Sequence, residues 1–198
     1  IEESQRSQLV LHESNISNKE FIDVLVAENQ FDDIYHLAAQ SSVARSIRHP
    51  RETIETNVLG LLEVTRRVLP HMVESGGGHV VVIGSIAGHK AYVGGGVYCG
   101  SKRALQPICE AIRMETLGQN IRVTSVDPGM VDTEFSVVRF RGDEEKAKGV
   151  YQGTRPLVAA DVAECVLFAA NRPAHVNLDT ILVMPTDQAS PQMVHRTD

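Results

Sequence analysis

The chain alternates short apolar runs with longer stretches in which apolar residues recur every three or four positions. The runs predict strands at 8–12, 32–39, 76–85, 120–129 and 180–185, and the periodic stretches predict helices at 18–30, about 50–74, about 97–117 and 159–172. A polar segment at 130–158 is expected to hold one short helix at 143–152. Strands that alternate with helices predict a parallel sheet covered by helices on both faces, an open α/β fold.

Composition narrows the classes of function. The chain has 198 residues, of which 42% are hydrophobic and 22% charged, as expected for one globular domain. Its net charge of -6 gives no electrostatic case for a nucleic acid or an anionic membrane as partner, and no apolar run approaches the ~20 residues of a membrane span. The three cysteines and eight histidines lack metal-ligand spacing, so we expect no metal and a reduced, cytoplasmic protein.

The stretch 84–102, GSIAGHKAYVGGGVYCGSK, holds the candidate chemistry. Its end nearly matches a phosphate loop, with Gly95, Gly100, Ser101 and Lys102, but that motif needs the lysine before the hydroxyl. The other glycine cluster, SGGGH at 75–79, lies between a predicted helix and a predicted strand. A dinucleotide loop must instead follow a strand, so this cluster is interpreted as a turn.

Tyr98 and Lys102 are four residues apart, so on a helix they share one face. Ser85 ends a buried run, at the edge where open α/β sheets bind ligands. An ammonium ~4 Å from a phenol, at an effective dielectric of ~20, favours the phenolate by about 4 kcal/mol, or roughly 3 pH units. The three residues therefore suit reduction of a ketone or oxidation of an alcohol by a hydride-carrying cofactor, although such spacing alone more often means a partly buried ring and a solvated charge.

The same stretch resembles the active-site signature of the short-chain dehydrogenases/reductases: Ser, twelve residues, Tyr, three residues, Lys. Ser85, Tyr98 and Lys102 match it position for position. The stretch TNVLGLLEVTRRVLPHM resembles the family helix that carries a fourth catalytic residue, and Asn57 falls there. The resemblance implies that all four residues are catalytic, with Tyr98 as the acid/base and Asn57 holding a water in a proton relay.

The cofactor side of the resemblance rests on VDPGMVDTEF, which is similar to the segment after the family's sixth strand. There Pro128 and Gly129 would turn the chain, Val131 would meet the nicotinamide carboxamide, and Thr133 would meet the phosphates. Residues 57–198 resemble the serine/3-hydroxy acid dehydrogenase branch, which implies NADP as cofactor, with NAD left open. In that branch Tyr98 and Lys102 would also contact the cofactor, Lys102 at the nicotinamide ribose.

The same branch resemblance directs attention to Arg139 and Arg141 as anchors for a substrate carboxylate. We weigh that role against solvated loop charges and favour the second interpretation, because arginines are mostly found at the surface.

The first 60 or so residues depart from that branch. DDIYHLAAQSSVARSIRHPRETIETNVLG resembles the extended members of the superfamily, the nucleotide-sugar dehydratases and epimerases, so the chain looks like a splice of two relatives near 57–62. In this alignment Asn15 stands where the extended members have an Asp that contacts adenine, with Ile16 beside it. Ala38, in the loop after the strand at 32–39, is the remaining candidate cofactor contact.

Family members begin with a strand, a glycine-rich loop, a helix and a second strand, and we identify none of these here. The expected fold class is therefore α/β, a Rossmann-like doubly wound parallel sheet that is N-terminally truncated, and residues 1–198 are expected to form a single incomplete domain. The strand at 32–39 would then have an open edge, and a dinucleotide would bind weakly or not at all, because its glycine loop and helix N-terminus would be missing.

Three functions stay open. The leading one is an NADP-dependent dehydrogenase of small 3-hydroxy acids such as serine; the others are a nucleotide-sugar dehydratase or epimerase, and a truncated, non-catalytic fragment without a working cofactor site. The resemblance also implies a small-molecule substrate and a homo-oligomer formed through the helices at about 57–74 and 97–117.

Overall fold

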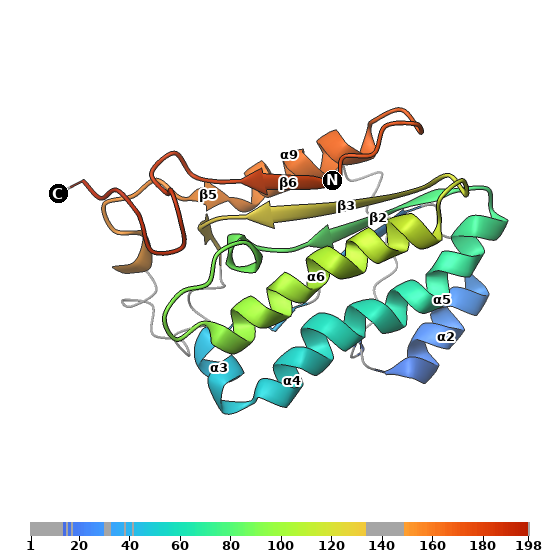
Figure 1. Ribbon diagram of the computed structural model, residues 1–198, viewed down its shortest axis with the longest axis horizontal. Coiled ribbons are helices and arrows are strands. Elements are labelled where there is room, and N and C mark those ends of the chain that lie inside the picture. The colour runs from blue at the N-terminus through green and yellow to red at the C-terminus, as the bar shows by residue number, and fades with distance from the viewer. Residues whose placement is uncertain are drawn as a thin grey trace, which may run out of the picture.

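A four-stranded parallel sheet forms the centre of the computed structural model, which describes residues 14, 16, 18–29, 33–37, 39–40, 42–133 and 149–197 (Figure 1). Its strands are β1 (Asp33–His36), β2 (Gly78–Ile83), β3 (Ile121–Pro128) and β6 (Thr180–Val183), in the order β1-β2-β3-β6. The predicted parallel sheet is thus confirmed. The expected strand at 8–12 lies outside the described residues, among which β1 pairs with β2 only.

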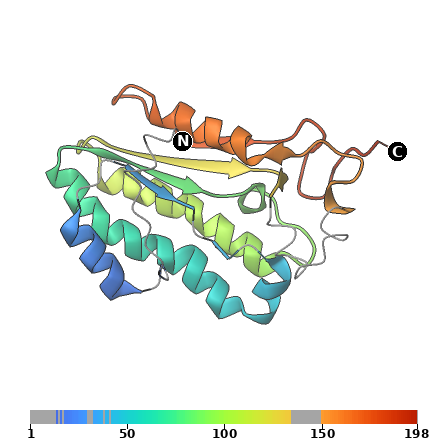
Figure 2. The same cartoon turned by 180° about the vertical axis from the view of Figure 1, so that it is seen from behind.

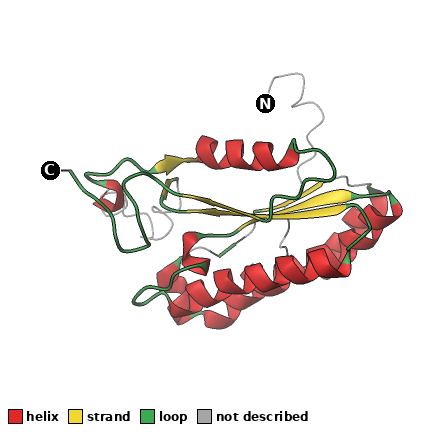
Figure 3. Cartoon of the chain, turned by 45° about the horizontal axis from the view of Figure 1, so that its top comes forward, coloured by secondary structure: helices red, strands yellow, loops and turns green. Residues whose placement is uncertain are grey.

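Helices cover both faces of this sheet, as the sequence pattern predicted (Figures 1 and 3). One face carries α5 (Gly60–Glu74) and α6 (Gly96–Glu115), with α2 (Lys19–Glu28) packed on α5. Seen from behind, α9 (Ala159–Ala170) covers the opposite face (Figure 2). No helix in the described ranges is long and apolar enough to cross a membrane.

Side-chain caps set the beginnings of several helices. The Asn18 side chain accepts a hydrogen bond from the amide of Phe21 and starts α2, and Asp161 accepts one from the amide of Val158 at the start of α9. Ser42 caps α3 (Val43–Arg48) in the same way. The sequence pattern predicted a loop there, because six residues are too few to show helical periodicity.

The predicted helix at about 50–74 is confirmed, with an unpredicted change of geometry inside it. The chain passes from α4 (Pro50–Ile54) through a π-helical segment, η1 (Glu55–Leu59), directly into α5. The amide of Gly60 donates to the carbonyl of Glu55, five residues back, which widens the helix by one residue. Asn57, in this segment, is buried.

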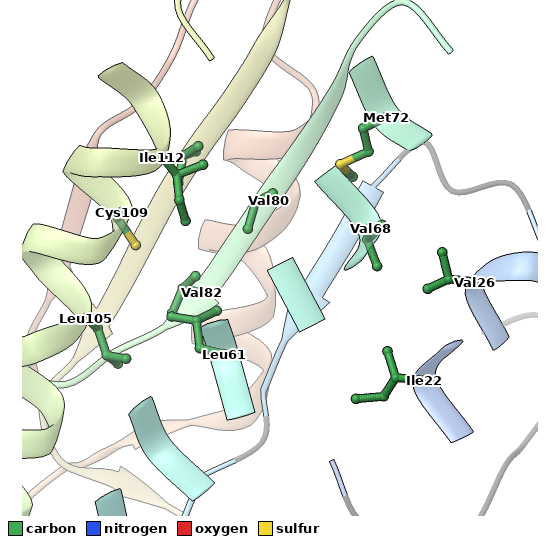
Figure 4. Packing of buried hydrophobic residues seen from close by; sticks show 11 residues of the cluster. Ile22, Val26, Leu61, Val68, Met72, Val80, Val82, Leu105, Cys109 and Ile112 are labelled. Carbon is green, nitrogen blue, oxygen red and sulfur yellow. The ribbon is translucent and has the colours of Figure 1, made fainter. Parts of the chain in front are cut away.

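The main hydrophobic core lies between the sheet and the helices α2, α5 and α6 (Figure 4). Its buried members are Ile22 and Val26 of α2, Leu61, Val68 and Met72 of α5, Val80 and Val82 of β2, Leu105, Cys109 and Ile112 of α6, and Val123 of β3. This packing fixes α6 against β2 and β3.

A second, two-stranded parallel sheet was not predicted. It pairs β4 (Val131–Asp132) with β5 (Leu157–Val158), just beyond the carboxyl end of β3. Each strand has two residues, which is too short for an alternating pattern to appear in the sequence. Most of the expected short helix at 143–152 lies outside the described residues.

Candidate active site

The turn that carries Ser85 lies at the carboxyl end of β2, where parallel sheets place ligands. Ser85 begins a short 3₁₀ turn, η2 (Ile86–Gly88), and its hydroxyl accepts a hydrogen bond from the amide of Ala87 at 3.1 Å. A Cβ built on Gly88 would come within 2.8 Å of the carbonyl oxygen of Lys102. Only glycine therefore lets this turn pack directly against α6.

Tyr98 and Lys102 lie on α6 and are both buried, with 6% and 5% of their surface exposed. Tyr98 belongs to a small apolar cluster with Val43, Ala87 and Cys99. Ala87 is part of the Ser85 turn, so the phenol ring packs against the turn that the sequence analysis paired with it. The predicted helix and the predicted shared face of Tyr98 and Lys102 are both present.

The Lys102 amine lies in the interior of the protein. Its Nζ donates a hydrogen bond to the carbonyl of Ile83, the last residue of β2, at 3.0 Å. Burial lowers the pKa of Lys102 to about 8, because the charged form loses its hydration, and the negative charge of Asp127 opposes this effect. The amine therefore changes charge close to neutral pH.

Asn57 joins three parts of the structure through its side-chain amide. Its Oδ1 accepts from the backbone amide of Gln40 at 2.6 Å, and its Nδ2 donates to the Gln40 carbonyl and to the Ser101 hydroxyl, both at 3.0 Å. Ser101 in turn donates to the carbonyl of Tyr98 at 2.8 Å. Asn57 thus ties the loop after β1 to the helix turn that carries Tyr98.

A second buried polar network, around Asp127, was missed by the sequence analysis. Asp127, near the end of β3, accepts hydrogen bonds from the hydroxyl of Ser125 at 2.6 Å and from the ring Nε2 of His89 at 2.5 Å. The side-chain nitrogen of Gln106, on α6, lies 3.0 Å from His89 Nε2 and 3.2 Å from His89 Nδ1. The one available signal in the sequence was an acidic residue directly before Pro-Gly at the end of a buried strand.

The segment expected to meet the cofactor follows β3 directly. The amide of Gly129 donates to the carbonyl of Val183, and the amide of Met130 donates to the side chain of Gln188 at 2.7 Å. A Cβ on Gly129 would come within 2.5 Å of the same Gln188 side chain. After Pro128 and Gly129 the chain thus turns into β4, which carries Val131; Thr133, exposed, follows it.

The remaining predicted residues lie toward the N-terminus or in the segment after β4. Ile16 is half-buried, and a Cβ built on Gly60, at the start of α5, would come 3.1 Å from its side chain. Asn15, Ala38, Arg139 and Arg141 lie outside the described residues.

Several predicted residues therefore lie on elements that pack on one another, namely the turn after β2, β3, α6 and the π-helical segment. The set combines a hydroxyl, a phenol, a buried amine and an amide. A phenol beside a cation can give and take a proton near neutral pH. The arrangement is suited to proton transfer at an oxygen whose carbon gains or loses a hydride.

Comparison with protein families and curated proteins gives consistent matches. The family model described as short chain dehydrogenase matches residues 18–143. An uncharacterized oxidoreductase of Mycobacterium tuberculosis is 50% identical over 144 residues, which are 73% of this chain and 57% of the relative, so the match spans little more than half of that protein. An NADP-dependent 3-hydroxy acid dehydrogenase of Schizosaccharomyces pombe is 43% identical over 178 residues, 90% of this chain and 68% of the relative.

Among solved structures, the closed form of a serine dehydrogenase complexed with NADP⁺ superposes with a TM-score of 0.86 at 35% identity. The superposition covers 98% of this chain and 85% of that one. The likeness therefore extends over the sheet, both helical layers and the edge where the candidate residues lie.

Proposed function

Since the chain belongs to the short-chain dehydrogenase family, we propose that it transfers a hydride between NADP and the hydroxyl or keto group of a small 3-hydroxy acid such as serine. The observation that carries the proposal is the burial of Tyr98 and Lys102 together on one face of α6, against the Ser85 turn. The names of the fission yeast relative and of the serine dehydrogenase structure support the substrate class.

In this proposal Tyr98 is the acid/base. Its hydroxyl takes the proton from the substrate alcohol in oxidation and returns it in reduction. Lys102, when charged, favours the phenolate that accepts the proton. Ser85, the first residue of the turn, donates a hydrogen bond to the carbonyl oxygen of the substrate and orients the substrate. Asn57 holds the helix turn of Tyr98 in place through Ser101, and its predicted water in a proton relay stays a prediction.

The residues at the carboxyl edge suit an NADP molecule. Within the described part of the chain, the Lys102 amine donates to the carbonyl of Ile83 alone, so it has further N–H groups for the hydroxyls of a ribose. The segment from Pro128 to Val131 and Thr133 would lie along the nicotinamide and the phosphates. When bound, NADP supplies or accepts the hydride; the protein residues bind it, orient the substrate and move the proton.

The proposed function is tested by the production of reduced cofactor from serine and from simple 3-hydroxy acids, with NADP and NAD in parallel and a nucleotide sugar as the alternative substrate. We expect turnover of a 3-hydroxy acid with NADP, rising up to high cofactor concentrations because weak cofactor binding is expected from the sequence, and none of the nucleotide sugar. A fluorescence titration with NADPH runs beside it and tests the weak dinucleotide binding expected from the sequence. Absence of NADPH binding and of turnover by this polypeptide would contradict the proposal and favour the non-catalytic alternative.

The proposed oligomer uses the helices α5 and α6. Large apolar side chains lie exposed at their ends, namely Leu59 and Leu62 at the start of the first, and Met114 and Leu117 at the end of the second. Burying such residues against a second copy would remove apolar surface from water. Sedimentation velocity of the wild type and of a Leu62→Lys variant tests this contact: the variant should dissociate.

A further inference from the structure

Two charged side chains differ from all other described ones in being buried. Lys102 and Asp127 are the only Asp, Glu, Lys or Arg side chains in the described ranges that are buried, with 5% and 2% of their surface exposed. A buried charge is costly unless a charge of opposite sign and hydrogen bonds compensate it. The two residues are of opposite charge and lie on adjoining elements, α6 and β3.

Both carboxylate oxygens of Asp127 are held by neighbouring side chains. Ser125 donates to Oδ1, and His89 contacts Oδ2 through Nε2. Because a carboxylate can only accept, Nε2 carries the proton, and His89 Nδ1 is then free to accept from Gln106. These contacts fix the position of the carboxylate beside the end of β2.

Both charged groups lie against the end of β2, at Ile83 and Gly84. The Lys102 amine donates to the carbonyl of Ile83, while the Asp127 carboxylate lies so close to the next residue, Gly84, that an added Cβ would collide with Oδ1. The amine and the carboxylate are thus held against neighbouring atoms of the same strand end. Asp127 also acts electrostatically on Lys102, favouring its charged form.

We propose that Asp127 is a positioning residue of the proposed reaction, whose buried carboxylate, held by Ser125 and His89, keeps the Lys102 amine in its ammonium form. The ammonium is the form that favours the Tyr98 phenolate, so Asp127 acts on proton transfer through Lys102 without touching the substrate. The catalytic part of this inference rests on the proposed function, whereas the effect on the Lys102 charge does not.

Other charges near α6 do not replace Asp127 in this role. On α3 and α4, which pack on α6, Arg45 pairs with Glu52, Arg51 pairs with Glu55, and Arg48 is exposed. On α6 itself, Arg113 pairs with Asp179, and Cys109 is buried in the apolar core. His89, at the end of η2, is bound to the carboxylate as described.

The test is to measure the protonation of Lys102 directly. NMR of protein labelled with ¹³C in lysine follows the five lysines of the chain through a pH titration, and a Lys102→Met variant assigns the resonance. Asp127→Asn keeps the shape of the side chain, and His89 can change tautomer to accept from the new amide. Asp127→Ser removes the same charge with a smaller group and serves if the first variant is not native by circular dichroism. Glu164→Gln, at an exposed position of α9, is the matched control, because it also removes one negative charge.

We expect the Lys102 midpoint to fall by about one pH unit in the Asp127 variants, the size of shift that a nearby opposite charge produces, and to stay unchanged in Glu164→Gln. The alkaline limb of the pH–rate profile should move by the same amount. An unchanged Lys102 midpoint in folded Asp127 variants overturns the inference, whether or not the enzyme turns over. A shifted midpoint in a protein without dehydrogenase activity upholds the effect of Asp127 on the Lys102 charge but contradicts the proposed function.

Discussion

Replacement of Asn57 by alanine should destabilise the protein as a whole, not only its active site. The wild-type side chain is 1% exposed and satisfies both the amide and the carbonyl of Gln40, as well as the hydroxyl of Ser101. Alanine can make none of these bonds. The chain would therefore keep two backbone groups of Gln40 without the partners that hold them in the folded state.

The magnitude follows from these lost partners. A buried polar group left without a hydrogen bond costs about 1–3 kcal/mol, so the two groups of half-buried Gln40 together cost about 3 kcal/mol in the free energy of unfolding. For a protein of this size that corresponds to a fall in Tm of about 6–12 °C. Ser101→Ala removes one partner of Asn57 and leaves both Gln40 bonds, so it should cost only about 1 kcal/mol.

Urea unfolding followed by circular dichroism measures both variants. Asn29→Ala provides the control, because Asn29 is exposed and its side chain, among the described residues, bonds only to the carbonyl of Leu25, so its loss should stay within about 0.5 kcal/mol. If the free energy of unfolding of Asn57→Ala lies within 1 kcal/mol of the wild-type value, the contact between the loop after β1 and α6 does not depend on this side chain. Asn57 would then matter only for the reaction.

Three further predictions concern packing and pH. Gly84→Ala should lose about 1–3 kcal/mol of stability in thermal or urea unfolding, because its Cβ would overlap the Asp127 carboxylate, whereas Gly100→Ala, with open space around its Cβ, should be neutral or stabilising. Burial lowers the pKa of His79 to about 4, whereas His79 of the unfolded chain is protonated near pH 6.5, so stability is lost as the pH falls from about 6.5 to 4. His79→Gln should reduce this dependence of the free energy of unfolding on pH by up to about 1.4 kcal/mol per pH unit, measured by urea unfolding at several pH values. An unchanged dependence on pH would contradict the prediction. The pKa of Lys102, lowered to about 8, predicts that turnover falls as the pH rises above about 8, since the neutral amine no longer favours the phenolate; a rate that stays level up to pH 10 would contradict it.

The parts of the fold that the sequence revealed are those with strong periodicity. The run before Ser85 is almost continuously apolar because β2 is buried, β3 is buried in the same way although it holds several polar residues, and the long helices show their apolar stripe clearly. The short elements escaped notice: α3 rests on the cap by Ser42, and β4 pairs through only two residues. Such elements depend on tertiary contacts more than on local pattern.

The shared helix face of Tyr98 and Lys102 was predictable from their four-residue spacing, whereas their assignment as a site came from the resemblance to the short-chain dehydrogenases/reductases. Ser85 was predictable from its place after a buried strand. The partners were not, because they come together from distant parts of the chain: Gln40 with Asn57 across 17 residues, and His89 with Asp127 across 38. The π-helical turn that brings Asn57 to Ser101 also leaves no signal in hydrophobic periodicity.

The most direct test of the central claim compares the wild type with Tyr98→Phe in the NADP-dependent oxidation of serine and other 3-hydroxy acids. Phenylalanine keeps the ring that packs against Ala87 and removes only the hydroxyl that moves the proton. The account predicts that kcat falls by at least about 100-fold, the usual share of an acid/base group, while NADPH binding weakens by no more than the loss of one hydrogen bond, about 1 kcal/mol. A Tyr98→Phe enzyme that turns over at the wild-type rate would contradict the assignment of this site.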